Sequence, residues 1–101
     1  MIVYNITVKI DSGIETEWMH WMRQEHIPEV MATGFFSEYK FYKLLNQDES
    51  DGPTYVIQYF TTAIENYNSY IEEQAPLLRQ KAISKWGNKF IVFRTLLQVV
   101  N

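Results

Sequence analysis

Hydrophobic and polar residues alternate at the start of the chain. From Ile2 to Ile10 the even positions are all aliphatic or aromatic, whereas the odd positions, apart from Val3, are polar. A two-residue period that uses β-branched side chains predicts a strand with one apolar and one more polar face. Residues 35–45, 54–61 and 89–100 are rich in β-branched and aromatic side chains and predict three further strands.

The apolar period lengthens to that of a helix after residue 13. The stripe at helical spacing consists of Ile14, Trp18, Trp21, Met22 and Glu25. We expect this helix to falter at Ile27, because Pro28 disfavours helical geometry in the residue before it. A last helical turn follows Pro28, and Gly34 ends the helix.

A second helical period covers residues 62–85, and Pro76 inside it predicts a kink or two abutting helices. The acidic segment 46–53, which contains Gly and Pro, is typical of a hairpin loop between two strands. The element order is therefore β-α-β-β-α-β. Right-handed crossovers place both helices on one face of a four-stranded antiparallel sheet. The predicted fold class is α+β, as a single ferredoxin-like βαββαβ domain over residues 1–101.

The last predicted strand is apolar on both faces, and helices on one side of the sheet cannot cover both. An exposed apolar sheet face favours association, and each large side chain that becomes buried contributes roughly 1.5–3 kcal/mol. We therefore expect a homodimer in which the two sheets pack face to face. The alternative is that a loop of the same chain covers the patch. The candidate interface residues are Phe90, Val92 and Leu96.

Composition and charge narrow the classes of function. Of 101 residues, 47% are hydrophobic and 21% charged, which is a globular composition with one core. The formal net charge is −3 without a basic cluster, so we expect no nucleic-acid partner, and an RNA-binding role lacks the basic residues it needs. No segment has the length of a membrane span or the pattern of a signal peptide. Together with the absence of cysteine, this predicts a cytoplasmic protein.

The end of the first predicted helix holds the candidate catalytic residues, Glu25 and His26. A carboxylate near an imidazole can perform general acid–base chemistry, since histidine titrates near neutrality. The structural alternative is that Glu25 caps backbone groups or pairs with an arginine, while His26 packs near the bend. Adjacent residues on a helix diverge by about 100°, so the two side chains need not touch.

Arg94 interrupts the apolar last strand, where a buried arginine needs an anionic partner. That partner is either a carboxylate, Glu25 or one across the dimer, or the anionic group of a ligand. Trp18, Trp21 and Met22 belong either to the core or to the lining of a cleft between the first helix and the sheet. With Arg94 they form the candidate ligand pocket.

We expect neither a metal nor a cofactor. His20 and His26 are six residues apart, outside the spacing that places two ligands on one helix face. The chain has no phosphate-binding loop and no nucleophile elbow of the Gly-x-Ser-x-Gly type.

Several segments resemble one known family. They are residues 18–22 (WMHWM), 25–30 (EHIPEV), 33–36 (TGFF), 55–60 (YVIQYF), 74–78 (QAPLL), 87–90 (GNKF) and 93–97 (FRTLL). Together they make the chain similar to domain of unknown function family 4286 (DUF4286), which carries no established activity. The resemblance implies the dimeric α/β-barrel group, in which two ferredoxin-like sheets pack face to face. That group includes antibiotic-biosynthesis-type monooxygenases, EthD-like proteins, polyketide cyclases and haem-binding enzymes.

The sequence thus predicts a homodimeric domain that binds a small hydrophobic or aromatic ligand in a cleft between the first helix and the sheet. One alternative, implied by the resemblance, is a cofactor-independent monooxygenase- or cyclase-like enzyme that acts on a small aromatic compound. The other is a non-catalytic regulatory or interaction module. A cavity beside His26 favours the first two, whereas a solid core favours the third.

Overall fold

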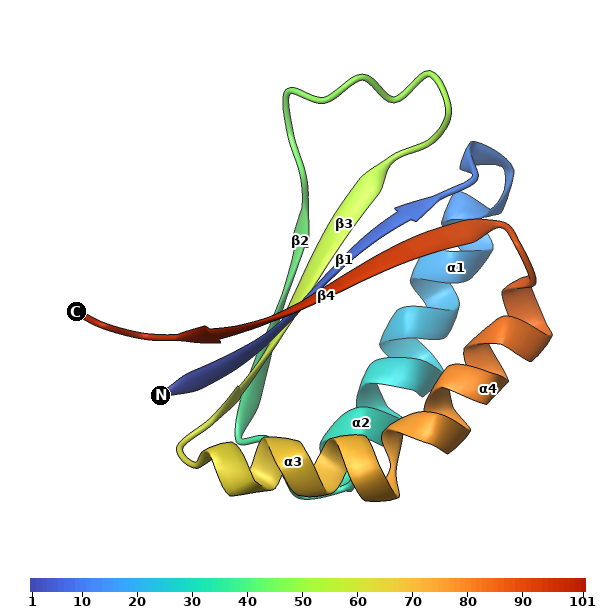
Figure 1. Ribbon diagram of the computed structural model, residues 1–101. Coiled ribbons are helices and arrows are strands. Elements are labelled where there is room, and N and C mark those ends of the chain that lie inside the picture. Colours follow the sequence, from blue (N-terminus) through green and yellow to red (C-terminus); the bar gives the residue numbers. More distant parts are fainter.

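A computed structural model describes residues 1–101 and shows an antiparallel sheet with all helices on one face (Figure 1). The sheet order is β2-β3-β1-β4, with strands β1 (Ile2–Ile10), β2 (Glu38–Lys43), β3 (Thr54–Thr61) and β4 (Phe90–Gln98). The helical elements are η1 (Ser12–Ile14), α1 (Glu15–Trp21), η2 (Met22–His26), α2 (Ile27–Ala32), α3 (Ile64–Glu73) and α4 (Ala75–Trp86). The predicted ferredoxin-like α+β fold is confirmed. None of the helices has the length and apolar character that crossing a bilayer requires.

The second helical segment divides at the predicted proline. Helix α3 ends at Glu73 and α4 begins at Ala75, so that Pro76 lies in the first turn of α4. The missing N–H of a proline is tolerated there because the first N–H groups of a helix have no intrahelical partner. The expectation of two abutting helices is therefore confirmed.

Strand β2 is shorter than predicted. It begins at Glu38 because Phe36 turns into the core, where it is 4% exposed, and Ser37 N donates a hydrogen bond to Phe60 O at 2.8 Å. Strand β4 likewise ends at Gln98, two residues before the predicted end.

The register between β1 and β4 decides which side of β4 meets the helices. Residues directly opposite one another in an antiparallel pair point to the same face. Phe90 lies opposite Ile10 and Val92 opposite Val8, and both β1 residues belong to the buried core. The even positions of β4 therefore face the helices.

The prediction that Phe90, Val92 and Leu96 form the interface on the bare face is wrong in its choice of face. Phe90 and Val92 pack against the core, and Leu96 lies opposite the buried Tyr4 on the same side. Leu96 is nevertheless 42% exposed, because the C-terminal part of β4 runs away from the helices (Figure 1). The bare face instead carries the odd positions Ile91, Phe93 and Leu97, which are 57%, 65% and 45% exposed.

A row of polar side chains crosses the centre of the bare face. Tyr42 Oη donates to Gln58 Oε1 at 3.1 Å, and Gln58 Nε2 donates to Asn5 Oδ1 at 3.1 Å. Asn5 Nδ2 in turn donates to Thr95 Oγ1 at 3.3 Å. This row links all four strands across the bare face.

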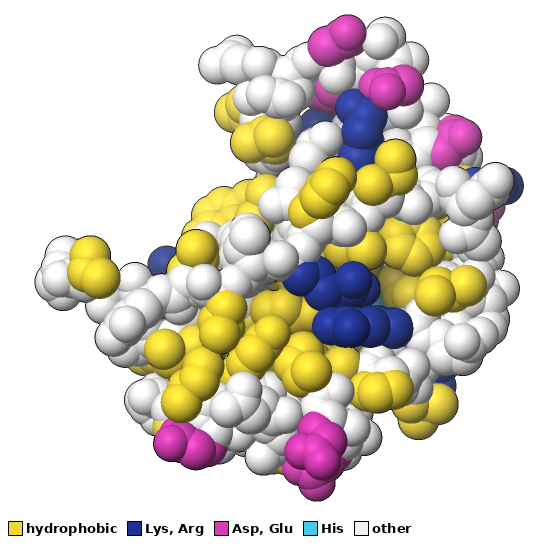
Figure 2. Space-filling model, viewed as in Figure 1, with side chains coloured by type: hydrophobic (Ala, Val, Ile, Leu, Met, Phe, Trp, Pro, Cys, Tyr) yellow, Lys and Arg dark blue, Asp and Glu magenta, His cyan; other side chains and the backbone are white.

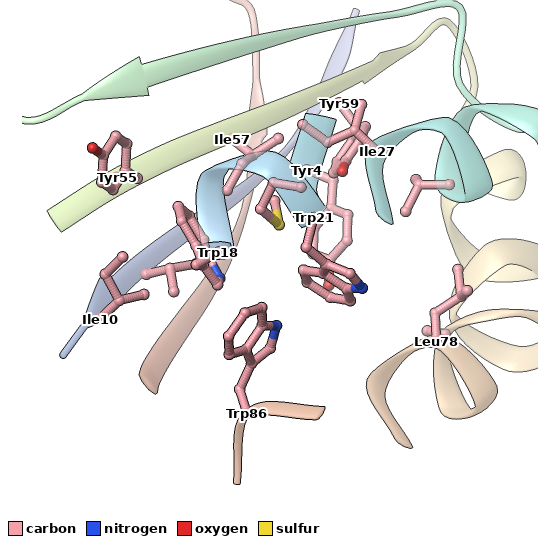
Figure 3. Close-up of a cluster of buried hydrophobic side chains, with 14 of the residues drawn as sticks. Tyr4, Ile10, Trp18, Trp21, Ile27, Tyr55, Ile57, Tyr59, Leu78 and Trp86 are labelled. Atoms are coloured by element: carbon pink, nitrogen blue, oxygen red, sulfur yellow. The ribbon is translucent and has the colours of Figure 1, made fainter. Parts of the chain in front are cut away.

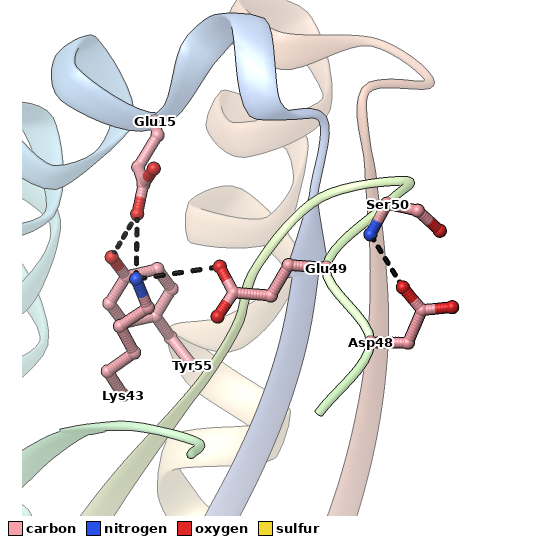
Figure 4. A network of polar contacts seen from close by, with 6 residues as sticks. All are labelled: Glu15, Lys43, Asp48, Glu49, Ser50 and Tyr55. Atoms are coloured by element: carbon pink, nitrogen blue, oxygen red, sulfur yellow. Dashed lines mark hydrogen bonds and ion pairs between the residues drawn. The ribbon is translucent and has the colours of Figure 1, made fainter. Parts of the chain in front are cut away.

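Polar contacts fix the start of α1 to the loop between β2 and β3 (Figure 4). Tyr55 Oη donates to Glu15 Oε2, and Lys43 Nζ lies 3.7 Å from the same oxygen and 3.6 Å from Glu49 Oε1. Burial and the neighbouring Glu15 carboxylate raise the pKa of Tyr55 to about 12. The first helix is thereby held at a fixed position over the sheet.

Candidate functional site

The π-helical turn η2 decides which residues of the first helix face inward. Ile27 N donates to Met22 O, a bond that spans five residues rather than four and inserts one extra residue into the turn. An uninterrupted α-helix would place Glu25 one turn beyond Trp21 on the buried stripe. In the structure His26 takes that position and stacks on Trp21, with ring centroids 4.8 Å apart and planes 24° apart.

The expectation that Glu25 lies on the buried stripe is therefore wrong, since its side chain is exposed. Glu25 borders a separate polar hollow on the outer surface of the helices, which His26 also reaches. The other polar residues of that hollow include Glu29 and Lys81, whose Oε2 and Nζ atoms lie 3.0 Å apart. The two candidate catalytic residues thus share an outer hollow, but only His26 reaches the interior.

A cavity of about 70 Å³ lies between the helices and the sheet. This is space for several water molecules or one small ring. Of its 17 lining residues, 14 are hydrophobic. The five residues predicted for this region that line it are Trp18, Trp21, Met22, His26 and Arg94. Figure 3 shows Trp21 and Trp86 near each other, with the strand residues Tyr4, Ile57 and Tyr59 further up in the view.

Two arginines line this cavity, Arg79 on α4 and Arg94 on β4. Figure 2 shows basic side chains in the middle of this face of the molecule, surrounded by hydrophobic ones. Arg79 Nη2 donates to Tyr4 Oη at 3.2 Å. Every ion pair in the structure is made by a lysine, so neither arginine is paired with a carboxylate.

The expectation that Arg94 is buried and paired with a carboxylate such as Glu25 is wrong for the single chain. Its side chain is exposed, and an exposed guanidinium stays hydrated and needs no ionic partner. The remaining prediction, an anionic group of a ligand, is considered below.

Two residues that line the cavity each carry a buried polar atom without a hydrogen-bond partner in the chain, Tyr59 Oη and Trp86 Nε1. Tyr59 is 0% and Trp86 7% exposed. An indole N–H can only donate, and a phenol O–H donates one bond and can also accept. Leaving such a group unsatisfied costs about 1–3 kcal/mol, so few of them occur in folded proteins. Tyr59 lines the cavity from β3 and Trp86 from α4, and packing alone does not explain two unsatisfied groups there.

The imidazole of His26 is uncharged at neutral pH. Burial lowers its pKa from 6.5 to about 4, with a smaller contribution from the positive charge of Arg94 and an opposing one from Glu29. A neutral imidazole has one nitrogen that donates and one that accepts. His26 can therefore act as a proton or hydrogen-bond acceptor toward a molecule in the cavity.

The cavity residues that the sequence analysis missed include three with polar side-chain groups, namely Tyr59, Arg79 and Trp86. The helical period offered a signal for two of them. Arg79 lies four residues after Ala75, and Trp86 lies four residues after Ala82, so each shares a helix face with a small apolar residue. The unpaired hydroxyl of Tyr59 has no signal in the sequence, since hydrogen-bond satisfaction depends on the folded neighbours.

Comparison with family models decides the family. The model of a domain of unknown function (DUF4286) matches residues 1–100. The chain belongs to this family. The resemblance drawn from the sequence segments is therefore confirmed. No curated protein matches the DUF4286 chain.

Solved structures share the fold of this DUF4286 chain at low sequence identity. An EthD family protein from Bacillus halodurans C-125 is 11% identical with a TM-score of 0.69, over 99% of this chain and all of that one. SnoaB, a cofactor-independent oxygenase from Streptomyces nogalater, is 12% identical with a TM-score of 0.68, and the match covers 99% of this chain and 94% of SnoaB. A dimeric ferredoxin-like protein from an uncultured marine organism is 14% identical with a TM-score of 0.63, and the match covers 99% of this chain and 95% of that protein. Identities this low show the fold alone.

Proposed function

We propose that this DUF4286 protein binds a small, largely apolar molecule in the cavity between its helices and its sheet. The observation that carries the proposal is the pair of unpartnered polar atoms, Tyr59 Oη and Trp86 Nε1, in residues that line the cavity wall. A molecule with acceptor atoms at this wall gives these groups the hydrogen bonds that the chain does not supply. Apolar groups at these positions would leave no polar atom unsatisfied in the empty protein, so the presence of the polar ones supports a binding role.

The shape and composition of the wall indicate a flat ligand. Trp21 and Trp86 meet edge to face with ring centroids 5.8 Å apart, and Trp18 lines the same space. Small-molecule sites are typically concave, mostly apolar and aromatic, with a few polar groups that fix orientation. Aromatic walls favour an aromatic or otherwise planar body by stacking and edge contacts.

The assembly that carries this cavity is proposed to be a homodimer, in which the bare sheet faces meet. Ile91, Phe93 and Leu97 are large hydrophobic side chains that the helices of their own chain leave exposed. Large hydrophobic side chains that gather exposed along one strand are typical of an interaction surface. The solved ferredoxin-like protein from an uncultured marine organism, which shares the fold, is described as dimeric.

Filling the cavity is expected to abolish ligand binding. Ala82 lines the cavity, so Ala82→Phe places a ring in the space that the ligand needs. Benzamide, a neutral planar probe, is expected to change the tryptophan fluorescence of the wild-type protein saturably, since three tryptophans line the cavity. In Ala82→Phe we expect an affinity at least about tenfold weaker, equivalent to the loss of 1.4 kcal/mol or more.

The neighbouring residue provides the matched control. Ile83 is 54% exposed on the outer side of α4, so Ile83→Phe adds bulk to the same helix without entering the cavity. It is expected to bind benzamide like the wild type. Equal binding by both variants would place the probe elsewhere, and a wild-type protein that gives no saturable signal would contradict the proposal.

A second candidate function is favoured by the neutral His26 in the cavity. An imidazole held uncharged beside a bound aromatic compound can accept its proton, which is one requirement of cofactor-independent oxygenation or cyclisation. This enzyme and the binding module differ in the fate of the ligand. An aromatic compound that is recovered unchanged after aerobic incubation supports a non-catalytic role, whereas a changed product supports the enzyme.

A further inference from the structure

We infer that the ligand of this cavity is a small planar carboxylate, whose anionic group is bound by Arg79 and Arg94 while its flat body lies against Trp21 and Trp86. The inference rests on the proposed function and names the chemical class of the ligand.

The first argument is the charge of the cavity wall. The three lining residues that are not hydrophobic are His26, Arg79 and Arg94, and none is acidic. The whole chain has the opposite balance, with 12 acidic and 9 basic residues and a formal net charge of −3. Two cations on the wall of an apolar cavity, in an acidic protein, create a local positive potential that favours an anion.

The second argument is that both arginines are free to bind a ligand. The chain has ample carboxylates, yet each ion pair is made by Lys9, Lys43 or Lys81. Arg79 uses one of its donors on Tyr4 Oη, which orients the guanidinium, and a guanidinium has five donors in all. Arginine matches the two oxygens of a carboxylate with parallel hydrogen bonds, a geometry that lysine does not offer.

The third argument is the supply of donors deeper in the wall. Trp86 Nε1 can only donate, and it has no partner in the chain. Arg79 and Arg94 also can only donate. These three donor groups are complementary to a ligand rich in acceptors, and a carboxylate supplies acceptors without any donor.

Three probes of nearly the same size and shape separate charge from shape. Benzoate is anionic, benzamide is neutral and benzamidine is cationic at neutral pH. We expect benzoate to bind at least about tenfold more tightly than benzamide, because hydrogen bonds to a charged group contribute more than those to a neutral one. Benzamidine is expected to show no saturable binding. Tryptophan fluorescence or calorimetry measures all three at low ionic strength, where exposed charges are least screened.

Charge-removing variants locate the anion site. In Arg79→Gln and Arg94→Gln we expect the affinity for benzoate to fall to about that of the wild type for benzamide, while the affinity for benzamide falls much less. Lys89→Gln removes the same charge at an exposed residue that does not line the cavity, and it should leave the preference for benzoate intact. Arg94→Lys keeps the charge without the planar fork, and an intermediate preference is expected.

The outcomes distinguish the inference from the function on which it rests. Equal affinities for benzoate and benzamide, unaltered by the arginine substitutions, would overturn the anionic ligand and leave small-molecule binding in place. If Lys89→Gln lowers the preference as much as Arg94→Gln does, the effect is one of net charge and the assigned site is wrong. A wild-type protein that binds neither benzoate nor benzamide overturns both proposals.

Discussion

Replacing Phe93 by glutamate is expected to convert the proposed homodimer into a monomer. Phe93 is 65% exposed on the bare face of the sheet, and in a face-to-face dimer both copies would bury a carboxylate without a partner. Central interface residues each contribute about 2 kcal/mol or more. Because the substitution acts twice, we expect the dissociation constant to rise by about three orders of magnitude. Sedimentation equilibrium over a range of concentrations measures this change.

A control on the other layer separates interface loss from added charge. Ile83 is 54% exposed on α4, so Ile83→Glu makes a similar change away from the bare face and should leave the dimer intact. The melting temperature of the Phe93→Glu monomer should reflect only the loss of dimer, since Phe93 is outside the core of its own chain. A Phe93→Glu protein that dimerises as tightly as the wild type, or a wild type that stays monomeric at high micromolar concentration, contradicts the proposed assembly.

Acidification is expected to destabilise the fold through His26. The pKa of His26 is about 4 in the folded chain, against an ordinary value of 6.5 in an unfolded one. Between these two values the unfolded chain binds the proton first, so the free energy of unfolding falls as the pH falls from 6.5 toward 4. Above pH 6.5 the imidazole is neutral in both states and contributes no pH dependence. The full difference between the two pKa values corresponds to a decrease in the free energy of unfolding of at most about 3 kcal/mol.

Substitution of each histidine tests this assignment. Urea unfolding at pH 7 and at pH 4.5 should show a smaller loss of stability for His26→Gln than for the wild type. His26→Phe keeps a ring against Trp21, and it is the variant to measure if the glutamine variant folds poorly. His20 is exposed, so His20→Gln should retain the wild-type pH dependence. If removing His26 leaves that dependence unchanged, the buried neutral imidazole is not its source.

The order of the elements could be predicted from sequence because each depends on a local pattern. Residues 54–61 match β3 residue for residue, and Pro76 marks the division between α3 and α4. Alternation, helical spacing and the fixed geometry of proline act over a few residues and are visible in the sequence itself. The family followed from longer segments of the chain.

The errors concern properties that depend on packing. A π-helical turn shifts the inward position from Glu25 to His26, and no spacing rule in the sequence announces an inserted residue. Strand β4 is apolar on both faces, so only its register with β1 shows that Phe90 and Val92 face the helices. The unpaired state of Tyr59 Oη likewise exists only in the folded chain.

The indole N–H of Trp86 reports whether the cavity receives a ligand. Its ¹H–¹⁵N resonance can be assigned as the indole signal that disappears in Trp86→Phe, and its position followed during a titration with benzamide. Because Nε1 has no partner in the chain, we expect a saturable downfield shift as the probe supplies an acceptor, and no such shift in Ala82→Phe. A Trp86 signal that stays in place at saturating benzamide, or moves equally in Ala82→Phe, would contradict ligand binding in this cavity.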